Sequence, residues 1–155
     1  MAEKLKILKF PDPRLRTVAE KVTKFDKSLE ILANDMLELM YKENGIGLAA
    51  TQVNHHIRLI TIDISEERNS PMIFVNPEFE IINEDSHLSF EEGCLSVPGF
   101  NEEITRPDNI KLKWQDIKGE EHEDMPSGLL TVCIQHEIDH LEGKLMVDYV
   151  QIMCY

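Results

Sequence analysis

The sequence has little of what membrane, secreted or nucleic-acid-binding proteins need. It lacks an apolar run of about 18 residues, which excludes a typical membrane-spanning helix, and its N-terminus has no signal-like apolar stretch. Its three cysteines are an odd set that suits a reducing compartment better than a disulfide framework. With 16 basic against 29 acidic residues, the formal net charge is −13, which argues against nucleic acid or an anionic membrane as a partner. We therefore expect a protein of the cytoplasm.

The chain also lacks internal repeats, linkers and low-complexity tracts that would divide it. Hydrophobic residues make up 42% of the sequence and charged residues 29%, which is ordinary for a globular fold. A chain of 155 residues is long enough to bury a full core without extra cross-links. We expect one domain that spans residues 1–155.

The clearest motif is Gln-His-Glu-Ile-Asp-His at residues 135–140, which contains an H-E-x-x-H pattern. Histidines four residues apart lie on the same face of a helix, so His136 and His140 can reach one ion. Glu137 can approach a water molecule on that ion without being a ligand. The alternative is a surface helix with two solvated histidines. Apolar residues on almost every side of the motif favour a buried helix instead, and buried imidazoles need partners such as a metal.

A catalytic metal site of this kind usually has three protein ligands and one open position. No histidine follows His140, and Met146 stands where the metzincin pattern requires one, so peptidase families with a downstream ligand do not fit. Cys94 is the preferred third ligand, because it lies in a loop of glycine and small residues. Cys133, on roughly the same helix face, is more simply a packed wall residue, and Cys154 is too near the terminus to favour. The remaining histidines stand in polar contexts and are expected to be solvated: His55, His56, His87 and His122.

The rest of the chain predicts an α+β fold. Apolar positions recur at helical spacing between residues 26 and 42, with Asp26 or Ser28 as the N-cap and Asn44-Gly45 at the end. The expected strands are residues 58–64, residues 72–82 as a pair or one bent strand, and a hairpin of residues 110–114 and 120–124. Shorter expected features are a strand or extended arm at residues 5–10, a helical turn at residues 14–19 and a charged loop at residues 65–71. Antiparallel β-sheets are therefore expected to wrap around the central H-E-x-x-H metal helix, with one further long helix in the N-terminal half.

Three segments in order resemble the motifs of the peptide deformylase family. They are Gly-Ile-Gly-Leu-Ala-Ala-Thr-Gln at residues 45–52, Glu-Gly-Cys-Leu-Ser at residues 92–96, and residues 135–143 around the two histidines. On composition alone the first segment is a tight turn, and a role facing a ligand is left open. The resemblance extends over residues 6–149. It implies a metal-dependent hydrolase that removes the formyl group from N-formylmethionine at the start of nascent polypeptides.

The resemblance also implies a role for each residue of the site. Cys94, His136 and His140 would hold the metal, with water in the fourth position. Glu137 would take the proton of the attacking water and pass a proton to the leaving amine. The oxyanion donors would be the Gln52 side chain and the backbone N–H of Leu95. The family positions further imply substrate binding by Ile46, Gly47, Leu129, Val132 and Cys133, and structural support from Gly45, Glu92 and Arg106.

Two imidazoles and a thiolate suit zinc, iron(II), nickel or cobalt. The resemblance implies one divalent ion per chain, Fe(II) in cells, with zinc, nickel or cobalt as alternatives in purified protein. It implies N-formylmethionyl nascent peptides as partners and a location in the cytoplasm, that of an organelle or phage-infected host included. Contact with the ribosome near the exit tunnel stays open, because the segment after the metal helix is shorter than in many relatives.

Two other functions remain to be weighed against deformylation. The first is a related enzyme for another N-acyl substrate, which assays on different acyl groups would reveal. The second is a non-catalytic metal- or peptide-binding module, which would be expected to have lost Glu137 or Gln52. Both residues are present, and they favour an enzyme.

Overall fold

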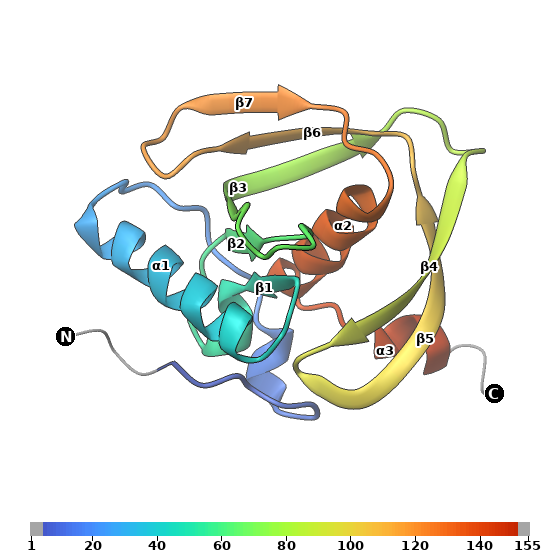
Figure 1. The fold of residues 1–155 in the computed structure, drawn as a ribbon, viewed down its shortest axis with the longest axis horizontal. Helices are drawn as coiled ribbons and strands as arrows, with labels where there is room; N and C mark the ends of the chain where they lie inside the picture. The colour runs from blue at the N-terminus through green and yellow to red at the C-terminus, as the bar shows by residue number, and fades with distance from the viewer. Residues whose placement is uncertain (1–4, 152–155) are drawn as a thin grey trace.

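The computed structural model describes residues 5–151 and has an α+β fold (Figure 1). The helices are α1 (Lys27–Lys42), α2 (Leu129–Leu141) and α3 (Val147–Gln151), with 3₁₀ turns η1 (Pro13–Arg16) and η2 (Ala50–Val53). The strands are β1 (Gly47–Ala49), β2 (Leu59–Ile62), β3 (Met72–Ile81), β4 (His87–Cys94), β5 (Val97–Pro107), β6 (Ile110–Gln115) and β7 (Glu121–Asp124).

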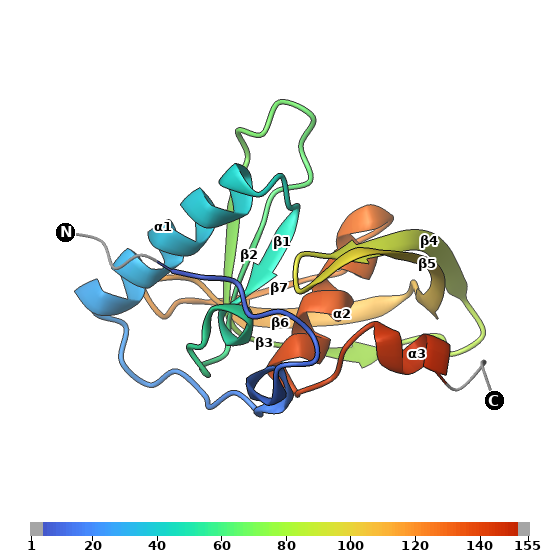
Figure 2. The same cartoon turned by 90° about the horizontal axis from the view of Figure 1, so that it is seen from below.

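The strands form two antiparallel sheets on either side of α2. The larger sheet has the order β1-β2-β3-β6-β7, and the smaller sheet is the β4-β5 hairpin. Figures 1 and 2 show α2 between the larger sheet and this hairpin, with α1 beside β1 and β2. The predicted arrangement of antiparallel sheets around a central metal helix, with one further long helix before it, is confirmed.

The helix α2 forms the centre of the core. Its side chains are buried without interruption from Thr131 to Ile138, and His140 and Leu141 are buried as well. The apolar members pack against residues of the larger sheet, among them Ile60, Phe74 and Leu112. The sequence-based prediction of a buried helix is thus confirmed, and the helix holds its polar residues inside the molecule. In the stretch from residue 5 to residue 151, no helix has both the length and the apolar character needed to cross a bilayer.

The boundaries of α1 follow the expected capping chemistry. The side chain of Asp26 accepts a hydrogen bond from the backbone N–H of Leu29 at 3.2 Å, as an N-cap does. At the other end Asn44 adopts φ = 58°, the left-handed conformation that commonly ends a helix. Asn44 therefore ends the helix, and Gly45 does not have a positive φ.

Of the predicted residues 72–82, Met72–Ile81 form a single bent strand. The pairing of β3 with β6 shifts register between Val75 and Glu78, and Asn76 lies within this bulge at φ = 51°. The Asn76 side chain bonds the backbone of Val22 and the side chain of Gln115. These bonds stabilise the bend, so the strand continues past Pro77.

Other local predictions differ from the structure. Residues 5–10 form no strand, which was one of the two alternatives predicted for them, and the helical turn expected at residues 14–19 is η1 at Pro13–Arg16. The strands β1 and β5 and the helix α3 were not expected. β5 contains proline, glycine and charged residues, and most of its side chains are exposed, so it lacks the alternation by which a half-buried strand is recognised.

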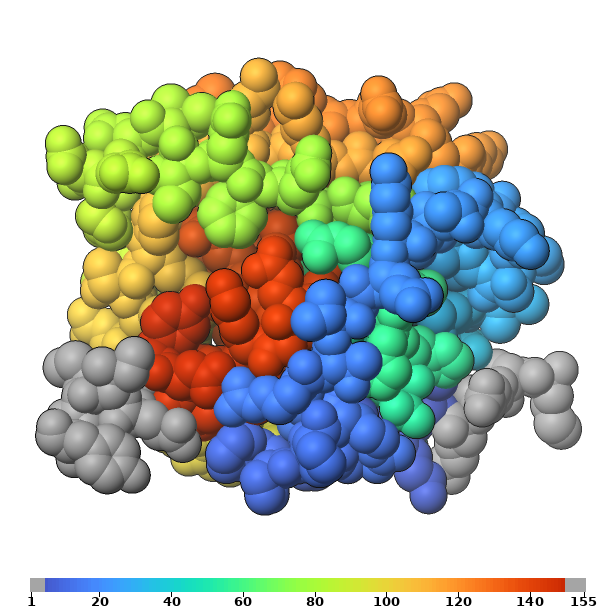
Figure 3. All heavy atoms as spheres, turned by 180° about the vertical axis from the view of Figure 1, so that it is seen from behind, coloured from blue at the N-terminus to red at the C-terminus, as the bar shows by residue number. Residues whose placement is uncertain are grey.

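Residues 16–19 lie against the C-terminal segment on one face of the molecule. Figure 3 shows the blue N-terminal segment directly beside the red C-terminal segment. The backbone N–H of Ala19 donates to the carbonyl of Leu141 at 2.8 Å. Arg16 pairs with both carboxylate oxygens of Asp148 at 2.6 and 2.8 Å. The end of α2 and the start of α3 are thus fastened to the N-terminal segment.

Candidate metal centre and active site

Three side chains from two distant parts of the chain converge on one point. His136 and His140 lie one turn apart on α2, with ring centroids 5.0 Å from each other. Cys94 ends β4, and its Sγ lies 3.3 Å from Nε2 of His140. One potential ligand atom from each of the three residues lies within 4.8 Å of the other two. The structure brings together the two histidines and the cysteine that the sequence singles out.

This donor set fits a divalent transition-metal ion. Ligands of a tetrahedral zinc ion lie about 2.0–2.3 Å from the metal and hence roughly 3.5 Å from one another, close to the sulfur–nitrogen distance seen here. Nδ1 of His140 and Oε1 of Glu137 are buried and have no hydrogen-bond partner within residues 5–151. Buried polar atoms need partners, and a water molecule on an ion held at Nε2 of His140 would supply one for Oε1 of Glu137.

Glu92 orients one of the two histidines. Its Oε1 accepts from Nδ1 of His136 at 2.9 Å, so Nε2 of that ring is left to face the ligand set. Arg106 donates to both carboxylate oxygens of Glu92 at 2.7 and 2.9 Å. All three side chains are buried. Burial by itself raises the pKa of Glu92, but its bonds with Arg106 and His136 outweigh burial and hold that pKa below its usual value.

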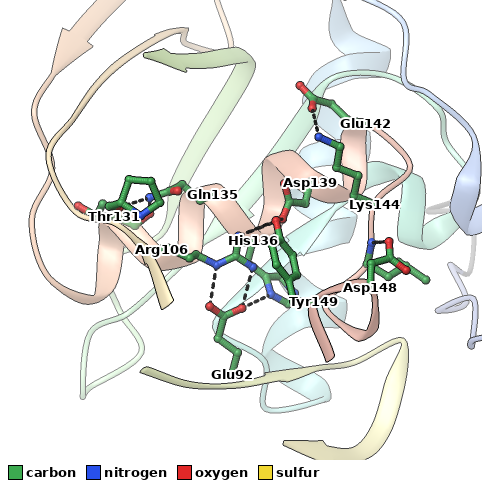
Figure 4. Close-up of polar contacts among 12 residues, drawn as sticks. Glu92, Arg106, Thr131, Gln135, His136, Asp139, Glu142, Lys144, Asp148 and Tyr149 are labelled. Atoms are coloured by element: carbon green, nitrogen blue, oxygen red, sulfur yellow. Dashed lines mark hydrogen bonds and ion pairs between the residues drawn. The ribbon is translucent and has the colours of Figure 1, made fainter. Parts of the chain in front are cut away.

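Arg106 connects this pair to the last helix (Figure 4). Its Nη1 donates to Asp139 Oδ2 at 2.9 Å, and the phenol of Tyr149 donates to the same oxygen at 2.7 Å. The guanidinium also lies over the Tyr149 ring, 5.0 Å from its centroid. Asp139 therefore supports Arg106 and does not belong to the cluster of Cys94, His136 and His140.

Glu137 points into the space beside the ligands. Its side chain is 4% exposed, and burial raises its pKa to about 7. Gly47 makes room for it, because a Cβ at that position would lie 2.5 Å from Oε2 of Glu137 and 3.0 Å from Sγ of Cys133. The first glycine-rich segment thus packs directly on the carboxylate. This close approach explains why its second glycine, Gly47, has no side chain.

Gln52 lies on η2, directly opposite the end of β4. Its Oε1 accepts from the backbone N–H of Ala49 at 2.9 Å, and its Nε2 donates to Ser96 Oγ at 3.0 Å. Nε2 also lies 3.6 Å from Sγ of Cys94. Leu95 follows Cys94 in the turn between β4 and β5. Both proposed oxyanion donors therefore belong to segments that border the metal ligands.

A cavity of about 470 Å³ opens beside the ligand set, within the size range of small-molecule sites. Its wall includes Glu137, His136 and Cys94. It also includes every residue predicted to bind substrate, namely Ile46, Gly47, Leu129, Val132 and Cys133. Gly45 and Glu92 line it as well, whereas Arg106 lies behind Glu92 and does not.

The remaining candidates have other surroundings. Cys133 is buried in the cavity wall and, within the described residues, is a free thiol outside the three-atom cluster. His87 and His122 are exposed as expected, and His55 and His56 are half-buried, so less of their surface reaches solvent than the polar context indicates. Their neighbours Ile57 and Leu59 draw this loop toward the core. Cys154 lies outside the described residues.

Sequence reasoning missed three residues that contact the site. Ser96 binds Gln52 from inside the second motif, and Tyr149 binds Arg106 and Asp139. Lys9 donates to the carbonyl of Leu95 at 2.8 Å. Each of these contacts joins residues at least ten positions apart, so local spacing gave no signal for them. Two histidines and a buried glutamate on a helix between antiparallel sheets, with a cysteine from the end of β4 beside them, are the features of a metallohydrolase.

Comparison with known families identifies this metallohydrolase more closely. A family model described as polypeptide deformylase matches residues 4–154, and the chain belongs to this family. It is 55% identical over 147 residues to the peptide deformylase of Hahella chejuensis, covering 95% of this chain and 87% of that protein. It is 56% identical over 146 residues to that of Cellvibrio japonicus, covering 94% and 86%.

Solved structures agree with the sequence relatives. The crystal structure of a peptide deformylase from Legionella pneumophila has a TM-score of 0.87 at 44% identity, over 94% of this chain and 85% of that one. The enzyme from Thermotoga maritima has a TM-score of 0.88 at 40% identity, over 94% and 97%. Members of this family are metal-dependent hydrolases that remove the N-formyl group from nascent peptides, and this is the activity of the chain.

Proposed function

We propose that Cys94, His136 and His140 bind one divalent ion, and that the formyl amide of N-formylmethionyl peptides is hydrolysed beside it. One observation carries this assignment. Three ligand atoms within 4.8 Å of one another adjoin the buried carboxylate of Glu137, whose Oε1 has no hydrogen-bond partner in the described part of the chain. Different residues of one site then bind the ion, transfer the proton and stabilise the developing charge.

The ion is one per chain, and we propose Fe(II) as the ion in cells. When bound, it polarises the formyl oxygen and lowers the pKa of a water molecule, so that a nucleophile forms near neutral pH. A thiolate with two imidazoles also accepts zinc, nickel or cobalt, so the purified protein can carry any of these. Cys94 is the residue through which oxidation would remove the ion, because a thiolate oxidises more readily than an imidazole.

Glu137 moves the proton. Its carboxylate accepts a proton from the attacking water as the new carbon–oxygen bond forms, and delivers a proton to the amine nitrogen as the carbon–nitrogen bond breaks. The products are formate and a peptide with a free amino terminus. Van der Waals contact with Gly47 limits the positions open to the carboxylate, which keeps it directed toward the reacting atoms.

Two hydrogen-bond donors stabilise the negative charge that develops on the formyl oxygen. One is Nε2 of Gln52, and the other is the backbone N–H of Leu95. Fixed donors aimed at a developing charge are worth about 10²–10³ in turnover each in other enzymes. The nearness of Gln52 Nε2 to Cys94 Sγ, 3.6 Å, supports its role, because the formyl group must lie beside the ion that the thiolate holds.

The methionine side chain enters the apolar part of the cavity. Val132, Cys133 and Leu129 form this wall on α2, one or two turns before the ligand His136. Ile46 is 40% exposed at the cavity edge, where its backbone can pair with an extended peptide. Gly45 has little space for a side chain, because a Cβ there would lie 2.7 Å from Cδ1 of Leu95. The first motif and the oxyanion turn therefore pack together.

The test is formate release from a formyl-Met peptide. Protein prepared without oxygen and loaded with Fe(II) or nickel is expected to release formate, and chelator-treated protein is not. An acetyl-Met peptide runs in parallel and is expected to stay intact. Turnover of the acetyl peptide at a comparable rate would instead indicate a different N-acyl substrate, and no turnover from folded, metal-loaded protein would contradict the assignment.

We further propose that residues 1–155 act as one catalytic domain in the cytoplasm, near the ribosomal exit tunnel. Both sheets and all three motif segments meet at α2, which supports one domain. The substrates are nascent peptides, so proximity to the ribosome would increase their local concentration. Co-sedimentation of the full chain with ribosomes tests this, with salt titration to separate specific from electrostatic contact.

A further inference from the structure

Ser96 is a buried polar residue that the mechanism above does not use. It lies in the turn between β4 and β5, two residues after the ligand Cys94, and its side chain is 0% exposed. Its Oγ accepts the hydrogen bond from Nε2 of Gln52 at 3.0 Å. The Ser96 hydroxyl therefore contacts a proposed oxyanion donor from outside the substrate cavity, since Gln52 lines that cavity and Ser96 does not.

The hydrogen-bond pattern determines how the Gln52 carboxamide is turned. The backbone N–H of Ala49 can only donate, so the atom that faces it at 2.9 Å must be the oxygen Oε1. Nε2 then faces Ser96 and Cys94. One of its two hydrogens binds Ser96 Oγ, and the other points toward the ligand set, where Sγ of Cys94 lies 3.6 Å away.

The terminal torsion of a glutamine side chain is broad when nothing fixes it. Ala49 holds the oxygen, and Ser96 holds the nitrogen, so the carboxamide plane has two anchors. We propose that Ser96 is a positioning residue for deformylation: its hydroxyl fixes the Gln52 carboxamide so that the second hydrogen of Nε2, which points toward Cys94 Sγ, is directed to the place where the formyl oxygen binds. This inference rests on the proposed oxyanion role of Gln52.

The backbone around Ser96 is held independently of its hydroxyl. Three consecutive N-terminal residues bind both oxyanion segments: the N–H of Leu8 donates to the carbonyl of Gln52 at 2.7 Å, and that of Phe10 to the carbonyl of Ser96 at 2.7 Å. Between them, Lys9 Nζ donates to the carbonyl of Leu95 at 2.8 Å. Removal of the Ser96 hydroxyl is therefore expected to release the Gln52 side chain while the turn stays in place.

The test is a double-mutant cycle on the metal-loaded full chain with S96A, Q52A and the double variant. Q52A is expected to lower kcat by about 10²–10³-fold. S96A is expected to lower kcat by about tenfold, the factor that corresponds to one buried hydrogen bond, with KM unchanged. In the Q52A background S96A is expected to have less than about a twofold effect, because the two residues act as one unit.

Two variants serve as controls. S89A removes an exposed hydroxyl from the same hairpin, where Ser89 Oγ bonds the hydroxyl of Thr105 at 2.7 Å, and it is expected to leave kcat unchanged. S96T retains the hydroxyl and is expected to keep most of the activity, which matters if S96A fails to fold. Metal content and melting temperature are measured for every variant, so that loss of the ion or of the fold is separated from loss of positioning.

The possible outcomes separate this inference from the proposed function. Full activity of Q52A would overturn the oxyanion role of Gln52 itself. A large effect of Q52A together with an equal S96A effect in both backgrounds would overturn only the role of Ser96. Folded S96T that loses as much activity as S96A, or S96A with normal kcat, would overturn it as well. A decrease of kcat in S96A that disappears in the Q52A background would support the positioning role of Ser96.

Discussion

Glu137 combines features that its neighbours on α2 do not share. It is buried and lines the cavity, and one of its oxygens has no hydrogen-bond partner among residues 5–151. The adjacent His136 is held instead by Glu92 at 2.9 Å. A residue that serves proton transfer needs one free oxygen in reach of the reacting atoms, and Glu137 provides it.

We expect E137A to retain one metal ion per chain but to lose about 10²–10⁴-fold in kcat, because the carboxylate transfers a proton and does not bind the ion. C94A, in contrast, is expected to lose both the ion and the activity. Metal analysis of the purified variants and formate release measure the two effects. An E137A variant with near-normal turnover would contradict the proposed mechanism.

Gly47 allows the carboxylate of Glu137 its position. A methyl group at Gly47 would lie 2.5 Å from Oε2 of Glu137, closer than unbonded atoms approach. We expect G47A to displace the carboxylate and lower kcat/KM by roughly 10²-fold, the loss that about 1 Å of misplacement causes at a reacting centre. Steady-state kinetics measure this, and unchanged metal content would show that the ligands have not moved. Normal kcat/KM in G47A would contradict this, because it would show that the Glu137 carboxylate accommodates a methyl group at position 47 without losing its function.

The elements beside the first motif are joined by a second polar cluster around Asp63. Asp63 is fully buried, accepts from the phenol of Tyr41 at 2.6 Å, and accepts from the N–H of Ser65 and Ser70 at 2.8 and 3.0 Å. Its backbone N–H donates to the carbonyl of Ile46 at 2.8 Å. The cluster therefore connects α1, the loop after β2 and the segment that we propose binds the peptide.

This cluster predicts a specific dependence of stability on pH. Burial alone raises the pKa of Asp63, but hydrogen bonds from Ser65, Tyr41 and Ser70 outweigh it and hold that pKa well below its usual value of 3.8. Because the folded state favours the ionised form, this stabilisation is complete above pH 3.8 and decreases as the pH falls further. D63N lacks the titrating group. We expect the wild-type melting temperature to exceed that of D63N at pH 7, and the difference to shrink at pH 3. A constant difference would contradict the argument.

Elements with a strong local pattern could be predicted from the sequence. The helix α1 has an apolar stripe and an Asp26 cap, the β6-β7 hairpin has a turn sequence, and α2 is apolar on nearly all sides. β1 and β5 escaped prediction for different reasons. Gly47–Ala49 is too short to display a period, and β5 is stabilised mainly by pairing with β4 while most of its side chains are exposed.

The residues of the candidate site divide in the same way, into those with a local sequence pattern and those without one. Cys94, His136 and Glu137 stand in motifs whose spacing has a chemical meaning, so they could be named before their positions were known. Ser96 and Tyr149 could not, because their importance depends on which distant residues they touch. Ser96 contacts Gln52, 44 residues away, and Tyr149 contacts Arg106, 43 residues away. Such contacts arise only when the sheets close around α2.

At the scale of the whole molecule, the three candidate ligands come from two parts of the fold that are distant in the sequence. Cys94 belongs to the smaller hairpin, whereas His136 and His140 belong to the helix that packs on the larger sheet. An ion bound by all three would link the hairpin to the core. A water molecule on that ion would also supply a hydrogen-bond partner for the buried Oε1 of Glu137.

We therefore expect removal of the ion to destabilise the entire fold. A ligand that binds only the folded state stabilises it by about 4 kcal/mol when its free concentration is 1,000 times its dissociation constant. For a chain of this size, about 1 kcal/mol corresponds to a shift in Tm of roughly 2–4 °C, so chelation should lower Tm by roughly 8–16 °C.

Scanning calorimetry with and without chelator, with metal content measured on the same samples, tests this expectation. E137A, which keeps the ligands, should show the same loss of Tm on chelation, whereas C94A should have a low Tm that chelator does not change. Equal melting temperatures of metal-loaded and metal-free wild-type protein would mean that the hairpin and the core are held together by their packing alone. In that case the ion would contribute to the chemistry and not to the fold.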